Sequence, residues 1–218
     1  MRYLSAFIAA IAVFSCSNSY AGEGRLPEVT NTAHYVHRLE LFRMMPASEN
    51  PIVFLGDSLI ERCDWAELFG DPSIKNRGIS GDTTSGILYR LNDITKMKPR
   101  RIFLLVGLND IFIGDSAGSI SDNYGKVIGR LRASLPGTEI IVLSVLPTAK
   151  GRKVNGQVEA LNRRLERLAN TNDVQYVDLY SLLNKSPDGL GPSFSMDGVH
   201  LTGEAYGVIK KALSGYVR

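Results

Sequence analysis

Cysteine and histidine are scarce in this chain of 218 residues, which contains two cysteines and three histidines. The two cysteines, Cys16 and Cys63, are too few for a multi-cysteine metal site. If Cys16 is removed with an N-terminal leader, no intrachain disulfide can form either. Cys63 stands close to Trp65 and Phe69 in the sequence, so we expect it to be a buried small apolar residue rather than a reactive thiol.

A strong charge of one sign is also missing, because 25 basic residues nearly balance 22 acidic residues. The formal net charge is +3, and the Lys and Arg residues are scattered along the chain. A nucleic-acid surface or a polybasic membrane anchor normally needs a concentrated positive charge. The sequence therefore predicts no nucleic-acid partner.

No apolar run in the chain reaches the ~20 residues that span a bilayer, so no stable membrane span is expected. The N-terminal run, residues 4–14, follows Arg2 and precedes small and polar residues that end at Ala21. This pattern is typical of a secretory signal peptide over residues 1–21 and predicts an exported protein, periplasmic or secreted. Cys16, which follows Val13-Phe14-Ser15, leaves open the alternative of a lipoprotein anchored through Cys16.

The rest of the chain shows no repeat, low-complexity tract or linker that would divide it. With 44% hydrophobic and 22% charged residues, it can build one full-sized core. We expect one domain over residues 51–218. An N-terminal helical extension over residues 22–50 is expected to pack on this domain.

Short, continuous apolar runs predict buried strands at residues 52–55, 102–106, 140–143 and 174–177, with a weaker fifth at 73–76. Runs of this kind are typical of a parallel sheet that is covered on both faces. Between them, apolar residues recur every three or four positions, which predicts helices. These helical stripes lie at residues 87–94, 124–135, 154–168 and 205–216. The alternation predicts an α/β protein, a three-layer α/β/α sandwich around a parallel sheet of about five strands.

A Gly-Asp-Ser-Leu run, residues 56–59, directly follows the first predicted strand. Ligands of open parallel sheets bind beyond the carboxyl ends of the strands, so residues there are candidate site residues. A glycine allows the chain to turn sharply into a helix, which would leave the Ser58 hydroxyl at a helix N-terminus, where negative charge is favoured. Taken alone, Asp57 and Ser58 are typical of ordinary helix capping, so a catalytic interpretation needs partner residues elsewhere in the chain.

A serine hydroxyl becomes a nucleophile when a base accepts its proton, and histidine is the usual base. His200 follows Asp197 by three residues in one tight turn. Asp197 can accept a hydrogen bond from Nδ1 of His200 and leave Nε2 facing Ser58. An ordinary Asp-Gly turn beside a solvated histidine is the competing interpretation. His34 and His37 precede the first strand in a polar stretch and are expected to be surface residues.

Two further loops offer hydrogen-bond donors for the oxyanion that forms during ester cleavage. Residues 76–83, after the weak strand, include glycines whose backbone N–H groups could approach a substrate. Asn109, after the strand at 102–106, carries an amide that donates without titrating. Gly, Asn and Asp also dominate ordinary turns. All of these segments fall at predicted strand ends or before the last helix, so one pocket can hold them.

In their order along the chain, four runs resemble the four conserved blocks of the GDSL/SGNH hydrolase family. They are Gly56-Asp57-Ser58-Leu59, Gly81 within Ser-Gly-Asp-Thr, Gly107-Leu108-Asn109-Asp110 and Asp197-Gly198-Val199-His200. The resemblance implies a flavodoxin-like fold in which Ser58 is the nucleophile, His200 the base and Asp197 its orienting acid. It also implies an oxyanion hole formed by the N–H groups of Ser58 and Gly81 and the Asn109 amide. Residues 65–84 are similar to the branch with platelet-activating-factor acetylhydrolase catalytic subunits and bacterial acetylesterases, which favours an acetyl group.

The expected activity is therefore the hydrolysis of short-chain acyl esters, on small molecules or glycans, through an acyl-enzyme on Ser58. A lipase or lysophospholipase on the same triad is the near alternative. A non-catalytic carbohydrate-binding module on a hydrolase scaffold is the more distant one. Asp57, Asp110, Asp197 and His200 show no paired-histidine spacing, so neither a metal nor another cofactor is expected.

Overall fold

The computed structural model describes residues 30, 32–46 and 48–217. The expected signal peptide, residues 1–21 with Cys16, lies outside the described residues. Within the expected extension, residues 22–50, the structure places helix α1 (Ala33–Met44). No helix in the part of the chain that the structure describes has both the length and the apolar character needed to cross a membrane.

The domain is built on a five-stranded parallel sheet in the order β2-β1-β3-β4-β5. Its strands are β1 (Ile52–Gly56), β2 (Ile74–Gly78), β3 (Arg101–Leu105), β4 (Glu139–Leu143) and β5 (Gln175–Val177). This order is that of a flavodoxin-like sheet, in which the direction of winding changes between β1 and β3. The predicted fold class is therefore confirmed, and the weakest predicted strand is the edge strand β2.

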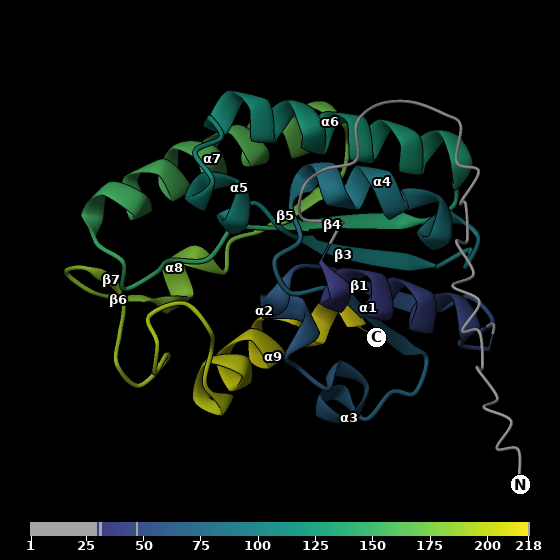
Figure 1. Ribbon diagram of the computed structural model, residues 1–218, viewed down its shortest axis with the longest axis horizontal. Helices are drawn as coiled ribbons and strands as arrows, with labels where there is room; N and C mark the ends of the chain where they lie inside the picture. Colours follow the sequence, from purple (N-terminus) through teal and green to yellow (C-terminus); the bar gives the residue numbers. More distant parts are fainter. Residues whose placement is uncertain (1–29, 31, 47, 218) are drawn as a thin grey trace, which may run out of the picture.

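Long helices cover both faces of the sheet, as Figure 1 shows. On one face lie α4 (Thr84–Thr95), α6 (Ala117–Ser134) and α7 (Arg152–Thr171), and on the other lie α3 (Trp65–Phe69) and α9 (Gly203–Val217). The apolar stripe of each long helix is buried, for example Val158, Leu161 and Leu165 of α7. Burial of such a stripe, rather than intrinsic propensity, supplies most of a helix's stability.

Five short elements did not stand out in the sequence. They are α3, α5 (Leu108–Phe112), α8 (Tyr180–Leu183) and the antiparallel pair β6 (Asn184–Ser186) and β7 (Gly189–Leu190). Each has two to five residues, so hydrophobic periodicity cannot reveal it.

Phe54, in the middle of β1, lies at the centre of an aromatic cluster in the core. Its ring stacks on Trp65 of α3 at a centroid distance of 4.3 Å and on Phe103 of β3 at 4.5 Å. The indole N–H of Trp65 donates to the carbonyl of Ile60, 2.9 Å away. This cluster fixes the segment that follows β1 against the sheet. Cys63 is 6% exposed beside it, and burial raises the pKa of its thiol to about 12, in keeping with its expected role as a small apolar residue.

Helix α1 packs against the loop that follows β2 (Figure 1). Tyr35, Leu39 and Phe42 form a small cluster with Ile79. The Tyr35 hydroxyl donates to the Gly86 carbonyl of α4 across 3.1 Å. Helix α1 is thus attached both to the loop that follows β2 and to the first turn of α4.

Candidate active site

Ser58 occupies the position that the sequence predicted, directly after β1. It is the first residue of helix α2 (Ser58–Glu61), and Asp57 caps the helix by accepting from the Leu59 N–H at 2.9 Å. A Cβ at Gly56 would lie 2.0 Å from the carbonyl oxygen of Leu105, so only glycine fits where the chain leaves the sheet. The Ser58 hydroxyl therefore lies at a helix N-terminus. The residue is nearly enclosed, at 7% exposure.

His200 meets Ser58 although 142 positions separate them in the sequence. Its Nε2 lies 3.1 Å from Ser58 Oγ, and its Nδ1 lies 2.6 Å from Asp197 Oδ2. Asp197 Oδ1 accepts the backbone N–H groups of Val199 and His200 at 2.9 and 2.8 Å. The hydrogen bond from the His200 side chain, and then these backbone N–H groups, hold the pKa of Asp197 well below its usual range. The carboxylate is therefore ionised and oriented toward the imidazole.

The other two histidines do not contact Ser58. Both lie on α1 and are exposed, as expected. His34 is closer to the site than its place in the sequence suggested, because its Nε2 bonds the Glu61 carboxylate of α2 at 3.0 Å.

Gly81, in the loop after β2, and Asn109, in the first turn of α5, are connected through Asp82. Gly81 has φ +82°, a conformation that glycine adopts readily and other residues rarely. The Asn109 side-chain amide donates one hydrogen bond to the Asp82 carbonyl at 2.9 Å. A side-chain amide has two N–H donors, so the second remains for another acceptor. The structure thus brings the predicted donor loops together after β2 and β3.

A buried ion pair supports the loop that contains Gly81. Arg90 Nε of α4 lies 2.8 Å from Asp82 Oδ2, and the two side chains are 1% and 0% exposed. Arg90 Nη2 also donates to the carbonyls of Gly56 and Arg77 at 3.1 and 2.9 Å. One guanidinium therefore connects the ends of β1 and β2 to the loop. The sequence carried a signal for it, since Arg90 falls between Ile87 and Leu91 on an otherwise apolar face.

The other side of Gly81 is held by Glu61, three residues after Ser58 on α2. Its Oε2 accepts the Ser80 backbone N–H at 2.6 Å and also binds the Ser80 hydroxyl. Its Oε1 lies 2.8 Å from Nε of Arg38 on α1. Burial raises the pKa of Glu61, but the hydrogen bonds from Ser80 and His34 outweigh it and the pKa lies below its ordinary value. No local pattern in the sequence points to Glu61, because its partners Ser80 and Arg38 lie far from it along the chain.

Three carboxylates, Asp57, Asp82 and Asp110, are buried around the site, each at 2% exposure or less. Burial raises the pKa of Asp57, the hydrogen bond from the Leu59 N–H opposes this rise, and the neighbouring Asp82 and Asp110 add to it, so that the pKa lies at about 7. Asp110 accepts the Thr84 backbone N–H at 3.0 Å and so ties α5 to the first residue of α4. Each of the three carboxylates accepts a backbone N–H, from Leu59, Thr83 and Thr84 in turn, and so holds a backbone segment in place.

The chain matches the GDSL-like Lipase/Acylhydrolase family over residues 54–208. The protein belongs to this family. As a GDSL-like acylhydrolase it acts on esters. The family resemblance of its four sequence blocks is confirmed.

Curated relatives of this GDSL-like acylhydrolase include platelet-activating factor acetylhydrolase IB subunit alpha2 from Rattus norvegicus. That protein is 31% identical over 176 residues, which cover 76% of this chain and 75% of the relative. The Homo sapiens protein of the same name shows the same identity and coverage.

Two solved structures show the same fold. A GDSL-like lipase from Bacteroides thetaiotaomicron has a TM-score of 0.75 at 24% identity, with 87% of this chain and 98% of the other covered. An acetylxylan esterase from Geobacillus stearothermophilus has a TM-score of 0.65 at 16% identity, with 78% and 95% covered.

Replacing Asp57 by Asn should make the stability of the acylhydrolase less dependent on pH. Asn keeps the oxygen that caps α2 but cannot ionise. Because burial raises the pKa of Asp57 from 3.8 to about 7, the folded protein retains a proton that the unfolded chain loses, and stability falls as pH rises through this interval. We expect Asp57→Asn to gain on the order of 1 kcal/mol relative to the native protein between about pH 5 and about pH 8.

Urea unfolding at both pH values measures this gain. Asp64→Asn is the matched control, because Asp64 is exposed and makes no side-chain cap bond. A stability difference between Asp57→Asn and the native protein that stays constant or shrinks as pH rises contradicts the assignment.

Proposed function

We propose that the protein is a serine esterase that removes short acyl groups, acetyl above all, through an acyl-enzyme on Ser58. The observation that carries this proposal is the unbroken hydrogen-bonded series from Ser58 Oγ through His200 to Asp197, with distances of 3.1 and 2.6 Å. In this arrangement a base contacts the hydroxyl, and an ionised carboxylate orients the base.

Catalysis proceeds in two halves. Ser58 Oγ attacks the ester carbonyl carbon while His200 Nε2 takes its proton, and Asp197 stabilises the imidazolium. The tetrahedral intermediate collapses, His200 returns the proton to the leaving alkoxide, and an alcohol departs. A water molecule then attacks the acyl-enzyme, again losing its proton to His200. The second tetrahedral intermediate collapses, His200 gives this proton to Ser58 Oγ, and a carboxylic acid departs.

The oxyanion of each tetrahedral intermediate is held by the N–H groups of Ser58 and Gly81 and by the second N–H of Asn109. Asn109 has one N–H engaged by Asp82, which fixes the direction of the amide. Gly81 lies between Ser80 and Asp82, whose side chains and backbone are bound to Glu61 and Arg90. Donors held in advance in this way stabilise the transition state without reorganisation.

The preference for acetyl rests on the relatives. Proteins named platelet-activating factor acetylhydrolase are 30 to 31% identical to this chain over most of their length. A structural neighbour is named an acetylxylan esterase. We propose acylated small molecules or glycans as substrates. Exposed apolar side chains flank the site in sequence, Ile113 four residues after Asn109 and Met196 directly before Asp197, at 71% and 92% exposure.

Ser58→Ala should abolish turnover of p-nitrophenyl acetate, because the attacking oxygen is removed. Loss of an essential triad serine lowers kcat by about a thousandfold or more. Ser119→Ala, an exposed position on α6, serves as the matched control and should keep full activity. Turnover by Ser58→Ala at the native rate rules out the acyl-enzyme.

The same assay with acyl chains of increasing length tests the acetyl preference. We expect kcat/KM to be highest for acetyl and to fall steadily for butanoyl, octanoyl and longer esters. A maximum at long chains instead assigns the site to a lipase or lysophospholipase. A folded protein that hydrolyses none of the esters and does not react with a fluorophosphonate at Ser58 is a non-catalytic binding module.

Arg90→Lys should lower kcat while leaving KM nearly unchanged. Lysine retains the positive charge beside Asp82 but cannot also reach the Gly56 and Arg77 carbonyls, so the loop with Gly81 loses its fixed position. An interaction that acts in the transition state affects kcat rather than ground-state binding, and we expect a loss of about tenfold. Steady-state kinetics with p-nitrophenyl acetate measures the split.

Arg130→Lys provides the comparison, since Arg130 is exposed and bonds only α4 atoms. Thermal unfolding of both variants separates positioning from loss of fold. If Arg90→Lys unfolds cooperatively and keeps the native kcat, or loses activity through KM alone, Arg90 does not position the oxyanion donors.

We also propose that the protein is exported and loses residues 1–21. The basis is the sequence pattern of Arg2, the apolar run at 4–14 and the small residues that end at Ala21. Expression with the full N-terminus in a bacterial host, followed by intact-mass analysis of the membrane and soluble periplasmic fractions, measures the outcome. We expect a soluble chain that begins at Gly22. A membrane-bound chain that begins at a lipidated Cys16 supports the lipoprotein alternative, and an unprocessed cytosolic chain contradicts export.

A further inference from the structure

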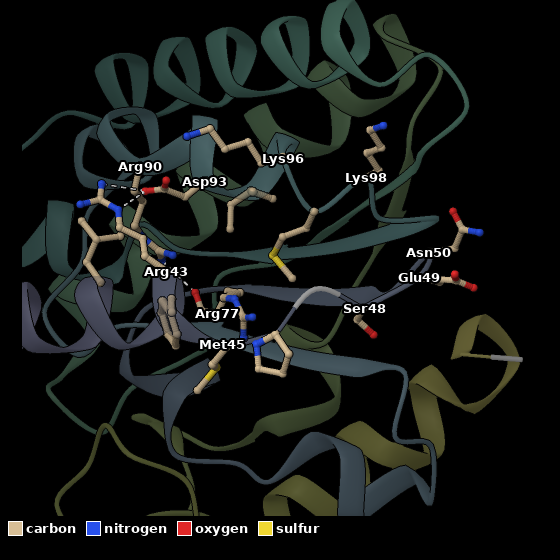
Figure 2. Close-up of a pocket in the computed structure, with 15 residues that line it drawn as sticks. Arg43, Met45, Ser48, Glu49, Asn50, Arg77, Arg90, Asp93, Lys96 and Lys98 are labelled. Atoms are coloured by element: carbon tan, nitrogen blue, oxygen red, sulfur yellow. Dashed lines mark hydrogen bonds and ion pairs between the residues drawn. The ribbon is translucent and has the colours of Figure 1, made fainter.

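A cavity of about 750 Å³ lies between α1, the segment before β1 and the C-terminal end of α4, as Figure 2 shows. None of Ser58, Gly81, Asn109, Asp197 and His200 lines it. Residues 48–50 line it at the beginning of β1, whereas Ser58 follows the opposite end of that strand. A volume of this size accommodates a small organic molecule. The proposed esterase chemistry makes no use of it.

The wall of this cavity contains a buried arginine that no carboxylate neutralises among the described residues. Arg77 of β2 is 6% exposed. Its guanidinium donates to the Asn76 carbonyl at 2.7 Å and lies 4.7 Å from the centre of the Phe42 ring. Burial and, after it, the positive charges of Arg90 and Arg38 lower the pKa of Arg77 to about 10. A buried cation among cations is costly unless an anion joins it.

Other charges on the cavity wall leave an excess of positive charge. Arg90 and Arg43 are paired with Asp82 and Asp93. Lys96 and Lys98 are exposed at the rim and have no ion pair within the described chain. Glu49 is the one further acidic residue among the described residues of the wall, so its single negative charge faces the three positive charges of Arg77, Lys96 and Lys98.

The remaining wall is largely apolar. It is formed by Leu39 and Phe42 of α1, Met45 and Pro46 after it, and Ile94 and Met97 at the end of α4. A ligand that fits this wall has an apolar body and an anionic group that reaches Arg77. A guanidinium offers paired N–H donors, which match the two oxygens of a carboxylate.

We propose that this cavity is a second binding site, separate from Ser58, for an amphipathic carboxylate: an anionic head bound by Arg77 and a medium-length apolar chain packed on Phe42, Ile94 and Met97. Arg77 supplies the charge and the hydrogen bonds. The apolar wall supplies the preference for a chain over a bare anion. Lys96 and Lys98 attract the anion to the opening through the electrostatic field at the rim.

Isothermal titration calorimetry of the full chain with sodium octanoate tests the proposal. We expect one octanoate per chain, no comparable binding of 1-octanol, which lacks the charge, and no comparable binding of inorganic phosphate, which lacks the apolar chain. Arg77→Met should weaken octanoate binding about tenfold or more, as expected for loss of a charge-assisted bidentate contact. Arg163→Met, an exposed position on α7, should bind as the native protein does.

Met97→Trp is the second variant. It fills the cavity from its apolar wall and leaves Arg77 in place, so octanoate binding should be weakened. If thermal unfolding shows that Arg77→Met does not fold, Met97→Trp still tests whether octanoate binds in this cavity. Ser58→Ala should bind octanoate normally, which separates this site from the esterase site even if the proposed activity fails. Octanoate affinity unchanged in Met97→Trp, equal binding of 1-octanol, or equal binding of inorganic phosphate overturns the proposal.

Discussion

The buried ion pair between Asp82 and Arg90 is the interaction on which the rest of this site depends. Removing two charges from water costs several kcal/mol for each, and their mutual attraction offsets this only when further hydrogen bonds satisfy them. Here the Gly56 and Arg77 carbonyls and the Thr83 N–H supply those bonds. Because these partners belong to β1, β2 and the loop between β2 and α4, the pair is satisfied only when all three are in place.

Glu61 extends this arrangement to helix α1. It lies one turn after Ser58, so the helix that carries the serine also holds Ser80 next to Gly81. Arg38 and His34 of α1 contact the same carboxylate. A single acidic side chain thus connects α1 both to α2, which carries Ser58, and to the loop that contains Gly81. A single ion pair that water still reaches contributes little to stability by itself, but several charges joined in one network fix geometry.

Much of the fold and of the site could be predicted from the sequence, because the decisive features are local. β1, β3 and β4 are continuous apolar runs. Ser58 and Asn109 follow two of these runs, and His200 precedes the apolar stripe of α9. Arg90 stands out locally only as a charge on an apolar helix face, and no local pattern points to Glu61. Their importance comes from partners 34 and 19 positions away, which a local pattern does not contain. The cavity beside Arg77 depends similarly on how α1 lies against α4.

The contact between Ser58 and His200 has a consequence for how the protein comes into being. It joins two positions 142 residues apart, and the acid that orients the histidine lies in the same late segment. Contacts of such long range form late, since a large loop must close before they are rewarded. During synthesis from the N-terminus, the five strands of the sheet, which end at Val177, therefore leave the ribosome before Asp197 and His200 do. The proposed triad is complete only once the segment with Asp197 and His200 has joined the folded sheet.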